Sequence, residues 1–182
     1  MNRQITTLPI PKTGKISLVV APKAVRYSLM SMLAALALRG RVIVIDGGNR
    51  FDGYGLARIL RQHTHHVQAV LKQVWLSRAF TCYQMVAMLA ELPLDGTPVI
   101  VLDMLTTFLD ENVNFTKRKR LLDNSLNLLR RISEKAPVAV WARIRSSATD
   151  EDDQLLTPLL ETAQDIWELQ PSETPTHQLP LF

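Results

Sequence analysis

Short runs of apolar residues recur along this sequence, and their lengths and compositions predict buried strands. The runs are rich in Val and Ile and are bounded by Gly, Pro or charged residues. They cover residues 15–20, 42–45, 74–76, 99–103, 138–141 and 165–169. Because most are apolar throughout rather than at alternate positions, they are typical of strands in a parallel sheet that is covered on both faces.

Segments of helix-forming residues alternate with these runs. They predict helices over residues 27–39, 56–62, 83–92, 117–135 and 154–162. Gly40 is placed to cap the first of these helices, and Pro93 to end the third. In the longest, Leu and Ile form one broad face and Arg and Lys lie opposite. The alternation predicts an α/β fold in a single domain, with a mostly parallel sheet between two layers of helices.

In such a sheet, ligands bind at the carboxyl ends of the strands. Those ends are marked here by Ala21, Asp46, Asp103 and Arg143. These four positions are therefore the first candidates for a functional site.

The composition narrows the class of protein. The chain has 182 residues, 47% of them hydrophobic, which fits one ordinary globular domain. Its single cysteine, Cys82, leaves no internal disulfide and suits a small core residue in a reducing compartment. We expect a cytoplasmic protein with no membrane association, because no apolar run has the length of a membrane span or a signal peptide. The cluster of His63, His65 and His66 is expected on an exposed loop or helix end, so no metal or cofactor is predicted.

The net charge of +4 conceals a strong asymmetry along the chain. Residues 115–145 contain nine Lys or Arg against two Asp or Glu, whereas residues 146–182 contain eight acidic residues and no basic ones. The basic segment suits a polyanion such as nucleic acid, although a solvated helix face is an equal alternative. The acidic, proline-containing end predicts a separate tail.

Four pieces of sequence occur in an order that resembles a known family. They are Gly14–Ser17 before the first strand, Val42–Asp46 followed by Asn49–Asp52, Trp75–Phe80 followed by Tyr83–Met85, and Val99–Asp103 followed by Met104–Phe108. Over residues 14–145 this order resembles the core of the RecA-like recombinase ATPases. The strand Val99–Asp103 resembles their Walker B strand. The resemblance implies a RecA-like fold; a flavodoxin-like arrangement is the alternative.

The catalytic parts of that family are not matched. A phosphate-binding loop needs glycines, a Lys and a Ser or Thr, but residues 21–28 place Ala21 and Arg26 at the glycine positions and Tyr27 at the Lys position. Only Ser28 agrees with the pattern.

Two further positions depart from the family. Gly48 stands where the resemblance places the water-activating glutamate, and Ala142–Arg145 replaces the polar sensor. Asp103 alone remains. We therefore expect a protein that is not an enzyme and needs no cofactor, with weak anion binding by Lys23 and Arg26 left open.

The resemblance also implies where DNA would bind. In the family, single-stranded DNA contacts the loops that correspond to Thr106–Arg120 and Arg143–Thr149. The start of the 117–135 helix is basic, although the dipole at a helix N-terminus favours acidic residues. This mismatch suggests that the helix binds an external anion there. Phe108 and Phe115 are the aromatic residues at hand for stacking. The candidate DNA-binding residues are Lys117, Arg118, Lys119, Arg120, Arg143 and Arg145.

The C-terminus carries a second motif. Residues 170–177 have the composition of a linker, so we expect a domain over residues 1–169 and a flexible tail over 170–182. The tail ends in Gln178, Leu179, Pro180, Leu181 and Phe182. This pentapeptide resembles the bacterial sliding-clamp-binding motif, in which an extended peptide inserts its Gln, Leu and Phe side chains into a groove. The alternative is that its apolar residues fold back onto the domain.

These observations predict a non-catalytic accessory factor of DNA repair or recombination, of the translesion-synthesis or SOS type. Its expected partners are the sliding clamp and a DNA polymerase or recombinase, with single-stranded DNA as a further candidate. Two alternatives remain: an SOS-type cell-division inhibitor with a RecA-like fold, which would have no use for a clamp motif, and an atypical ATP-binding RecA-like protein.

Overall fold

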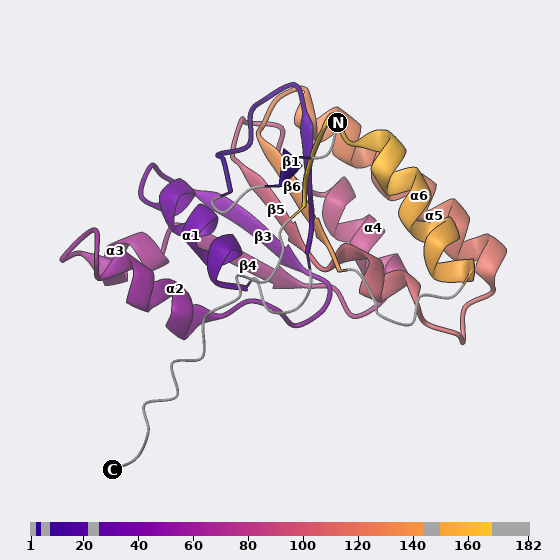
Figure 1. The fold of residues 1–182 in the computed structure, drawn as a ribbon, viewed down its shortest axis with the longest axis horizontal. Coiled ribbons are helices and arrows are strands. Elements are labelled where there is room, and N and C mark those ends of the chain that lie inside the picture. Colours follow the sequence, from indigo (N-terminus) through magenta and orange to yellow (C-terminus); the bar gives the residue numbers. More distant parts are fainter. Residues whose placement is uncertain (1–2, 5–7, 22–25, 144–149, 169–182) are drawn as a thin grey trace, which may run out of the picture.

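The fold is built around one seven-stranded sheet (Figure 1). The computed structural model describes residues 3–4, 8–21, 26–143 and 150–168. Its strands are β1 (Arg3–Gln4), β2 (Ile16–Val20), β3 (Val42–Asp46), β4 (Val74–Arg78), β5 (Val99–Leu102), β6 (Val138–Ala142) and β7 (Asp165–Glu168).

All neighbouring strands in the sheet are parallel, in the order β1-β7-β2-β6-β5-β3-β4. Parallel neighbours require crossover connections, and the helices supply them. The predicted α/β fold, with a parallel sheet in one domain, is confirmed. The carboxyl ends of β2, β6, β5 and β3 consequently lie side by side, which brings together the positions marked in the sequence.

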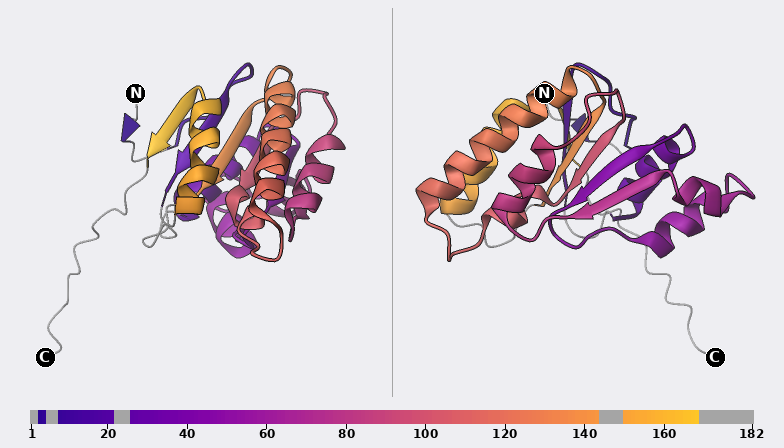
Figure 2. Two further views of the ribbon diagram at one scale, coloured as in Figure 1. Left: turned by 90° about the vertical axis from the view of Figure 1, so that its right-hand side faces the viewer. Right: turned by 180° about the vertical axis from the view of Figure 1, so that it is seen from behind.

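Helices cover both faces of the sheet (Figures 1 and 2). One face carries α1 (Arg26–Ala37), α2 (Gly53–Leu60) and α3 (Val67–Leu71). The other carries α4 (Cys82–Ala90), the 3-10 helix η2 (Met104–Phe108), α5 (Phe115–Ser133) and α6 (Asp150–Thr162).

A hydrophobic core lies on each face of the sheet. Each central strand contributes side chains to both cores, because successive side chains point to opposite faces. In β3, Ile43 and Ile45 pack beneath α4 and α5, whereas Val42 and Val44 pack beneath α1 and α2. This explains why the strand is apolar throughout.

Several element boundaries differ from the prediction because side chains cap the helices. The Asp52 carboxylate accepts a hydrogen bond from the Gly55 amide, so α2 begins at Gly53 rather than at residue 56. The Asn114 side chain likewise accepts from the Thr116 amide, and α5 begins at Phe115. The helices α3 and η2 were not predicted, since both are too short to show a helical period.

The prediction of a separate acidic tail was wrong for most of the acidic residues. Seven of the eight acidic residues after position 145 lie within α6 and β7, and four of them form the first turn of α6. Negative charge at a helix N-terminus is stabilised by the helix dipole. The acidic segment therefore belongs to the fold.

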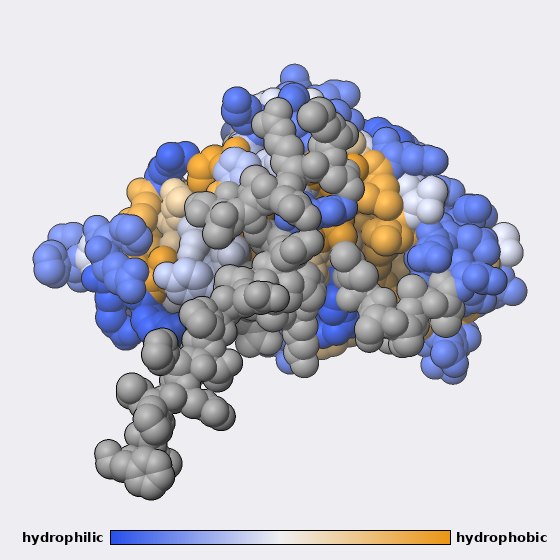
Figure 3. All heavy atoms as spheres, viewed as in Figure 1, coloured by the Kyte–Doolittle hydropathy of each residue, from blue (hydrophilic) through white to orange (hydrophobic). Residues whose placement is uncertain are grey.

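In the part of the chain that the structure describes, no helix combines the length and the hydrophobicity that crossing a bilayer requires. Figure 3 shows hydrophilic residues over α2 and α3 at one end of the molecule and over α5 and α6 at the other, with apolar residues gathered between them.

Candidate functional site

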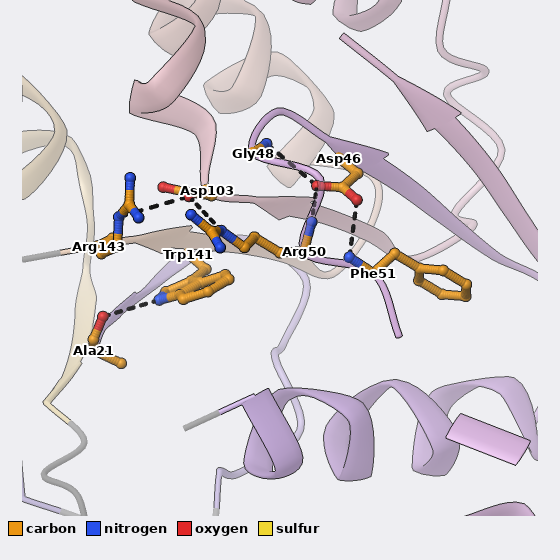
Figure 4. A network of polar contacts seen from close by, with 8 residues as sticks. All are labelled: Ala21, Asp46, Gly48, Arg50, Phe51, Asp103, Trp141 and Arg143. Carbon is orange, nitrogen blue, oxygen red and sulfur yellow. Dashed lines mark hydrogen bonds and ion pairs between the residues drawn. The ribbon is translucent and has the colours of Figure 1, made fainter. Parts of the chain in front are cut away.

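The strand ends form a connected polar cluster at the carboxyl edge of the sheet (Figure 4). Asp46 ends β3, Asp103 follows β5, and Arg143 follows β6. Arg50, which the sequence analysis did not select, reaches into the same place from the loop after β3. We call these four residues the strand-end cluster.

Asp46 organises the loop that follows its own strand. Its buried carboxylate accepts hydrogen bonds from the backbone amides of Gly48 at 3.2 Å, Arg50 at 2.8 Å and Phe51 at 2.8 Å. Three backbone donors satisfy most of the acceptor capacity of a carboxylate. Asp46 therefore holds the 47–52 loop in place.

Asp103 is the carboxylate that the resemblance assigns to a Walker B strand, and here guanidinium groups surround it. Its side chain is almost fully buried, with Arg50 Nε at 3.0 Å and Arg143 Nε at 3.8 Å from its Oδ2. Its backbone φ of 50° lies in the left-handed region, which Asp tolerates better than most residues. This conformation ends β5 and begins η2.

Gly48 packs directly against the Asp103 carboxylate. A Cβ atom built at Gly48 would collide with Oδ2, Cβ and Cγ of Asp103. The position at which the family carries a glutamate therefore has no room for a side chain unless Asp103 moves.

The strand-end cluster contains two carboxylates and two guanidinium groups, so its formal charges balance, and both guanidinium groups lie beside Asp103. A divalent cation prefers a surplus of oxygen ligands and negative charge, and both carboxylates already have partners. Among the described residues there is also no group of three or more His, Cys, Asp or Glu that could hold a metal ion. Ion pairs and hydrogen bonds within the cluster link the ends of β3, β5 and β6.

The end of β2 is tied to β6 beside this region, because the indole Nε1 of Trp141 donates to the Ala21 carbonyl at 3.3 Å (Figure 4). Residues 22–25, half of the stretch that was compared with a phosphate-binding loop, lie outside the described residues, as does the side chain of Arg26. The expectation that Lys23 and Arg26 attract an anion stays a prediction.

The five candidate DNA-binding residues that the structure describes do not form one surface. Lys117, Lys119 and Arg120 are exposed on the first turns of α5. Arg143 belongs to the strand-end cluster, and Arg145 lies outside the described residues.

Arg118 is the exception within the basic segment, because it is buried. It donates to the Phe108 carbonyl at 3.2 Å and forms an ion pair with Glu151 of α6 at 2.7 Å. This pairing accounts for one of the basic residues that are unexpected at a helix N-terminus. We therefore remove Arg118 from the residues available to DNA.

The segment Thr106–Arg120, taken from the resemblance as a DNA-contacting loop, is partly core. Its first residues lie in η2, and Phe108 is fully buried, so that ring is not available for stacking. Phe115 is half-buried, with the Arg118 guanidinium 5.3 Å from its ring centroid.

Sequence reasoning missed three exposed aromatic residues on β4 and at the start of α4, of which Tyr83 lies beside Lys117 of α5. Trp75 is 52% exposed on β4, Phe80 is 73% exposed after it, and Tyr83 is 43% exposed in the first turn of α4. A signal was available, because residues 53–90 contain no Asp or Glu at all. Aromatic side chains on an acid-free surface are a feature of nucleic-acid-binding proteins.

Two expectations on other reactive side chains are confirmed. Cys82 is buried at the start of α4, and burial raises the pKa of its thiol, which disfavours the nucleophilic thiolate. His63, His65 and His66 are exposed between α2 and α3.

The clamp-like pentapeptide Gln178–Phe182 lies outside the described residues. No protein-family model matches the chain, and a search of the curated proteins found no match either.

Proposed function

We propose that this chain is a cytoplasmic, non-catalytic accessory factor of DNA repair or recombination. In this proposal the α/β domain binds single-stranded DNA and a polymerase or recombinase partner, and the C-terminal tail recruits it to the bacterial sliding clamp. The proposal rests on the resemblance of residues 14–145 to the RecA-like core, on the tail motif and on the geometry of the strand-end cluster.

The ion pairing of Asp103 is the observation that carries the non-catalytic part. An ATPase of this kind uses the strand-end carboxylate to position magnesium. Arg50, 3.0 Å from Asp103, competes for the same oxygen, and the packing of Gly48 leaves no place for a water-activating glutamate. Both features favour a protein that keeps the sheet as a scaffold.

The exposed cations at the start of α5 support the DNA-binding part. Lys117, Lys119 and Arg120 project from consecutive turns of a helix end, where backbone amides also favour anions. With Arg118 and Arg143 engaged by carboxylates, these three residues are the proposed phosphate contacts, and Arg145 remains a proposed fourth.

The clamp-binding part is tested by calorimetric titration of a purified bacterial sliding clamp with the full chain. We expect saturable binding that disappears in the double variant Gln178→Ala with Phe182→Ala, because these residues supply the amide and the aromatic ring of the motif. Ser172→Ala with Thr174→Ala is the matched control, since it changes the same tail outside the motif.

Retention of clamp binding by the Gln178→Ala, Phe182→Ala variant would refute recruitment through the tail. Failure of the wild-type chain to bind the clamp would have the same consequence.

A further inference from the structure

One edge of the molecule carries no acidic residue over a long stretch of sequence. Residues 53–90 form α2, α3, β4 and α4; β4 is the last strand at this edge of the sheet, with α2 and α3 on one face and α4 on the other (Figures 1 and 2). Four basic side chains are exposed along this stretch and no carboxylate offsets them within it: Arg58, Arg61, Lys72 and Arg78.

Exposed aromatic side chains accompany this positive charge. Trp75 lies on β4, while Phe80 and Tyr83 lie at its carboxyl end. Tyr54 is 93% exposed in the first turn of α2, which follows the neighbouring strand β3. Solvent-exposed rings of this size are costly to leave in water, so several of them on one edge indicate a binding surface.

Two of the rings are paired with cations. The Arg41 guanidinium lies 4.1 Å from the ring centroid of Trp75, and Lys117 Nζ lies 5.1 Å from that of Tyr83. The Lys117 contact joins the β4 edge to the basic first turns of α5. A ring beside a cation offers both partners that a nucleotide needs, a face for the base and a charge for the phosphate.

The backbone of β4 adds hydrogen-bonding groups along the same edge. The Val42 amide donates to the Gln73 carbonyl and the Ala79 amide donates to the Asp46 carbonyl, so alternate residues from 73 to 79 face β3. Val74, Leu76 and Arg78 therefore direct their N–H and C=O groups outward. No strand in the described part of the chain pairs with them.

We propose that the β4 edge, defined by Trp75, Arg78, Phe80, Tyr83 and Lys117, is a track for single-stranded nucleic acid whose bases stack on the aromatic rings. The proposal rests on the DNA-binding role given above and deepens it by naming the surface and the single-stranded form of the ligand. Trp75 and Phe80 are five residues apart, which at about 3.3 Å per residue places them up to about 16 Å apart. That separation suits an extended strand.

The charge pattern favours nucleic acid over a second copy of this chain. A second copy of the chain would present the same acid-free surface by two-fold symmetry and would be repelled. Asp52 and Glu91 flank the acid-free stretch, and Asp95 and Asp110 lie close enough to Arg41 and Cys82 to act on them electrostatically. Within residues 53–90, no carboxylate offsets the four exposed cations.

The test is fluorescence anisotropy of a labelled oligothymidylate of about 15 nucleotides, within the range of about 4–16 that such surfaces occupy, titrated with the full chain. We expect Trp75→Ala and Phe80→Ala each to weaken binding at least about fivefold, since a stacked base contributes about 1–3 kcal/mol. Both side chains are largely exposed, so the variants should fold.

The control variant is Lys12→Ala, which removes an exposed cation near β2, four strands away from β4. Its affinity for the oligothymidylate should equal that of the wild type.

Intrinsic fluorescence gives a second readout, because Trp141 and Trp167 are buried and Trp75 is the exposed tryptophan of the three in the chain. Binding should quench this emission in the wild type, and Trp75→Phe should lose the quenching while it keeps most of the affinity.

Wild-type affinity in the combined Trp75→Ala, Phe80→Ala variant would overturn the track while leaving the DNA-binding role intact. If the wild-type chain binds no oligothymidylate at low salt, the track and the DNA-binding role both fail. A change in self-association of the combined variant, measured by light scattering with unchanged nucleic-acid affinity, would assign the edge to a second copy instead.

Discussion

At the scale of single residues, the environment of Asp103 decides what the strand-end cluster can do. The sequence correctly predicted that Asp46, Asp103 and Arg143 lie at the carboxyl ends of strands, and the observed strand order brings these ends together. It did not reveal the Arg50 contact, which joins residues 53 positions apart and depends on how the 47–52 loop turns. The sequence around an aspartate at the end of a strand does not reveal whether its side chain faces a cation site or an arginine.

Replacement of Gly48 tests this packing directly. We expect Gly48→Ala to destabilise the protein by about 1–3 kcal/mol, because the added methyl group must displace the Asp103 carboxylate and its ion pair with Arg50. The free energy of unfolding is measured by urea titration.

Gly53→Ala is the matched control for that variant. Its Cβ would meet only Phe51 Cε1 at 3.5 Å, an ordinary contact in the first turn of α2. This change should be neutral or stabilising by up to about 1 kcal/mol, as expected for Ala in a helix. Equal stability of Gly48→Ala and the wild type would show that Asp103 is not confined as described.

At the scale of elements, hydrophobic pattern predicted six strands and five helices with boundaries a few residues in error. The errors arise where a single polar side chain caps a helix, as Asp52 and Asn114 do. The role of the basic first turns of α5 was only partly predictable. Lys117, Lys119 and Arg120 face solvent, but Arg118 turns inward to Glu151 and ties α5 to α6, an interaction that depends on how the two helices pack.

Substitution of the buried Arg118 should therefore lower the stability of the protein, whereas substitution of the exposed Lys119 should not. We expect Arg118→Ala to cost about 1–3 kcal/mol of stability, since it removes hydrogen bonds from a charged group and leaves the Phe108 carbonyl without this donor. Lys119→Ala should stay within about 0.5 kcal/mol of the wild type, as exposed substitutions usually do. Chemical denaturation of both variants gives the comparison.

Nucleic-acid affinity should show the reverse order. Lys119→Ala with Arg120→Ala should lower affinity for single-stranded DNA and reduce the slope of log K against log salt by about 1.4, since each phosphate that a side chain neutralises contributes about 0.7 to that slope. A stable Arg118→Ala protein, or an unchanged salt slope in the Lys119, Arg120 variant, would contradict this division of roles.

At the scale of the whole molecule, the two edges of the sheet differ in charge, and the exposed aromatic residues lie at the edge that lacks acidic residues. The acid-free stretch 53–90 lies at the β4 edge, whereas the acidic residues of α6 and β7 lie toward the other edge. Net charge along the sequence indicated a basic and an acidic block. The sequence analysis placed the DNA-binding residues at the start of α5 and at Arg143 and Arg145, and not on β4, because the contribution of β4 becomes visible once the strand order puts it at an edge.

Above all, we propose that the strand-end cluster holds this sheet as a scaffold and supports no ATP hydrolysis. The most direct measurement is phosphate release from ATP by the full chain with magnesium, in the presence and absence of single-stranded DNA. We predict no release above the protein-free rate in either condition, because Asp103 is occupied by Arg50 and Arg143. Magnesium-dependent turnover that disappears in Asp103→Ala would contradict the account.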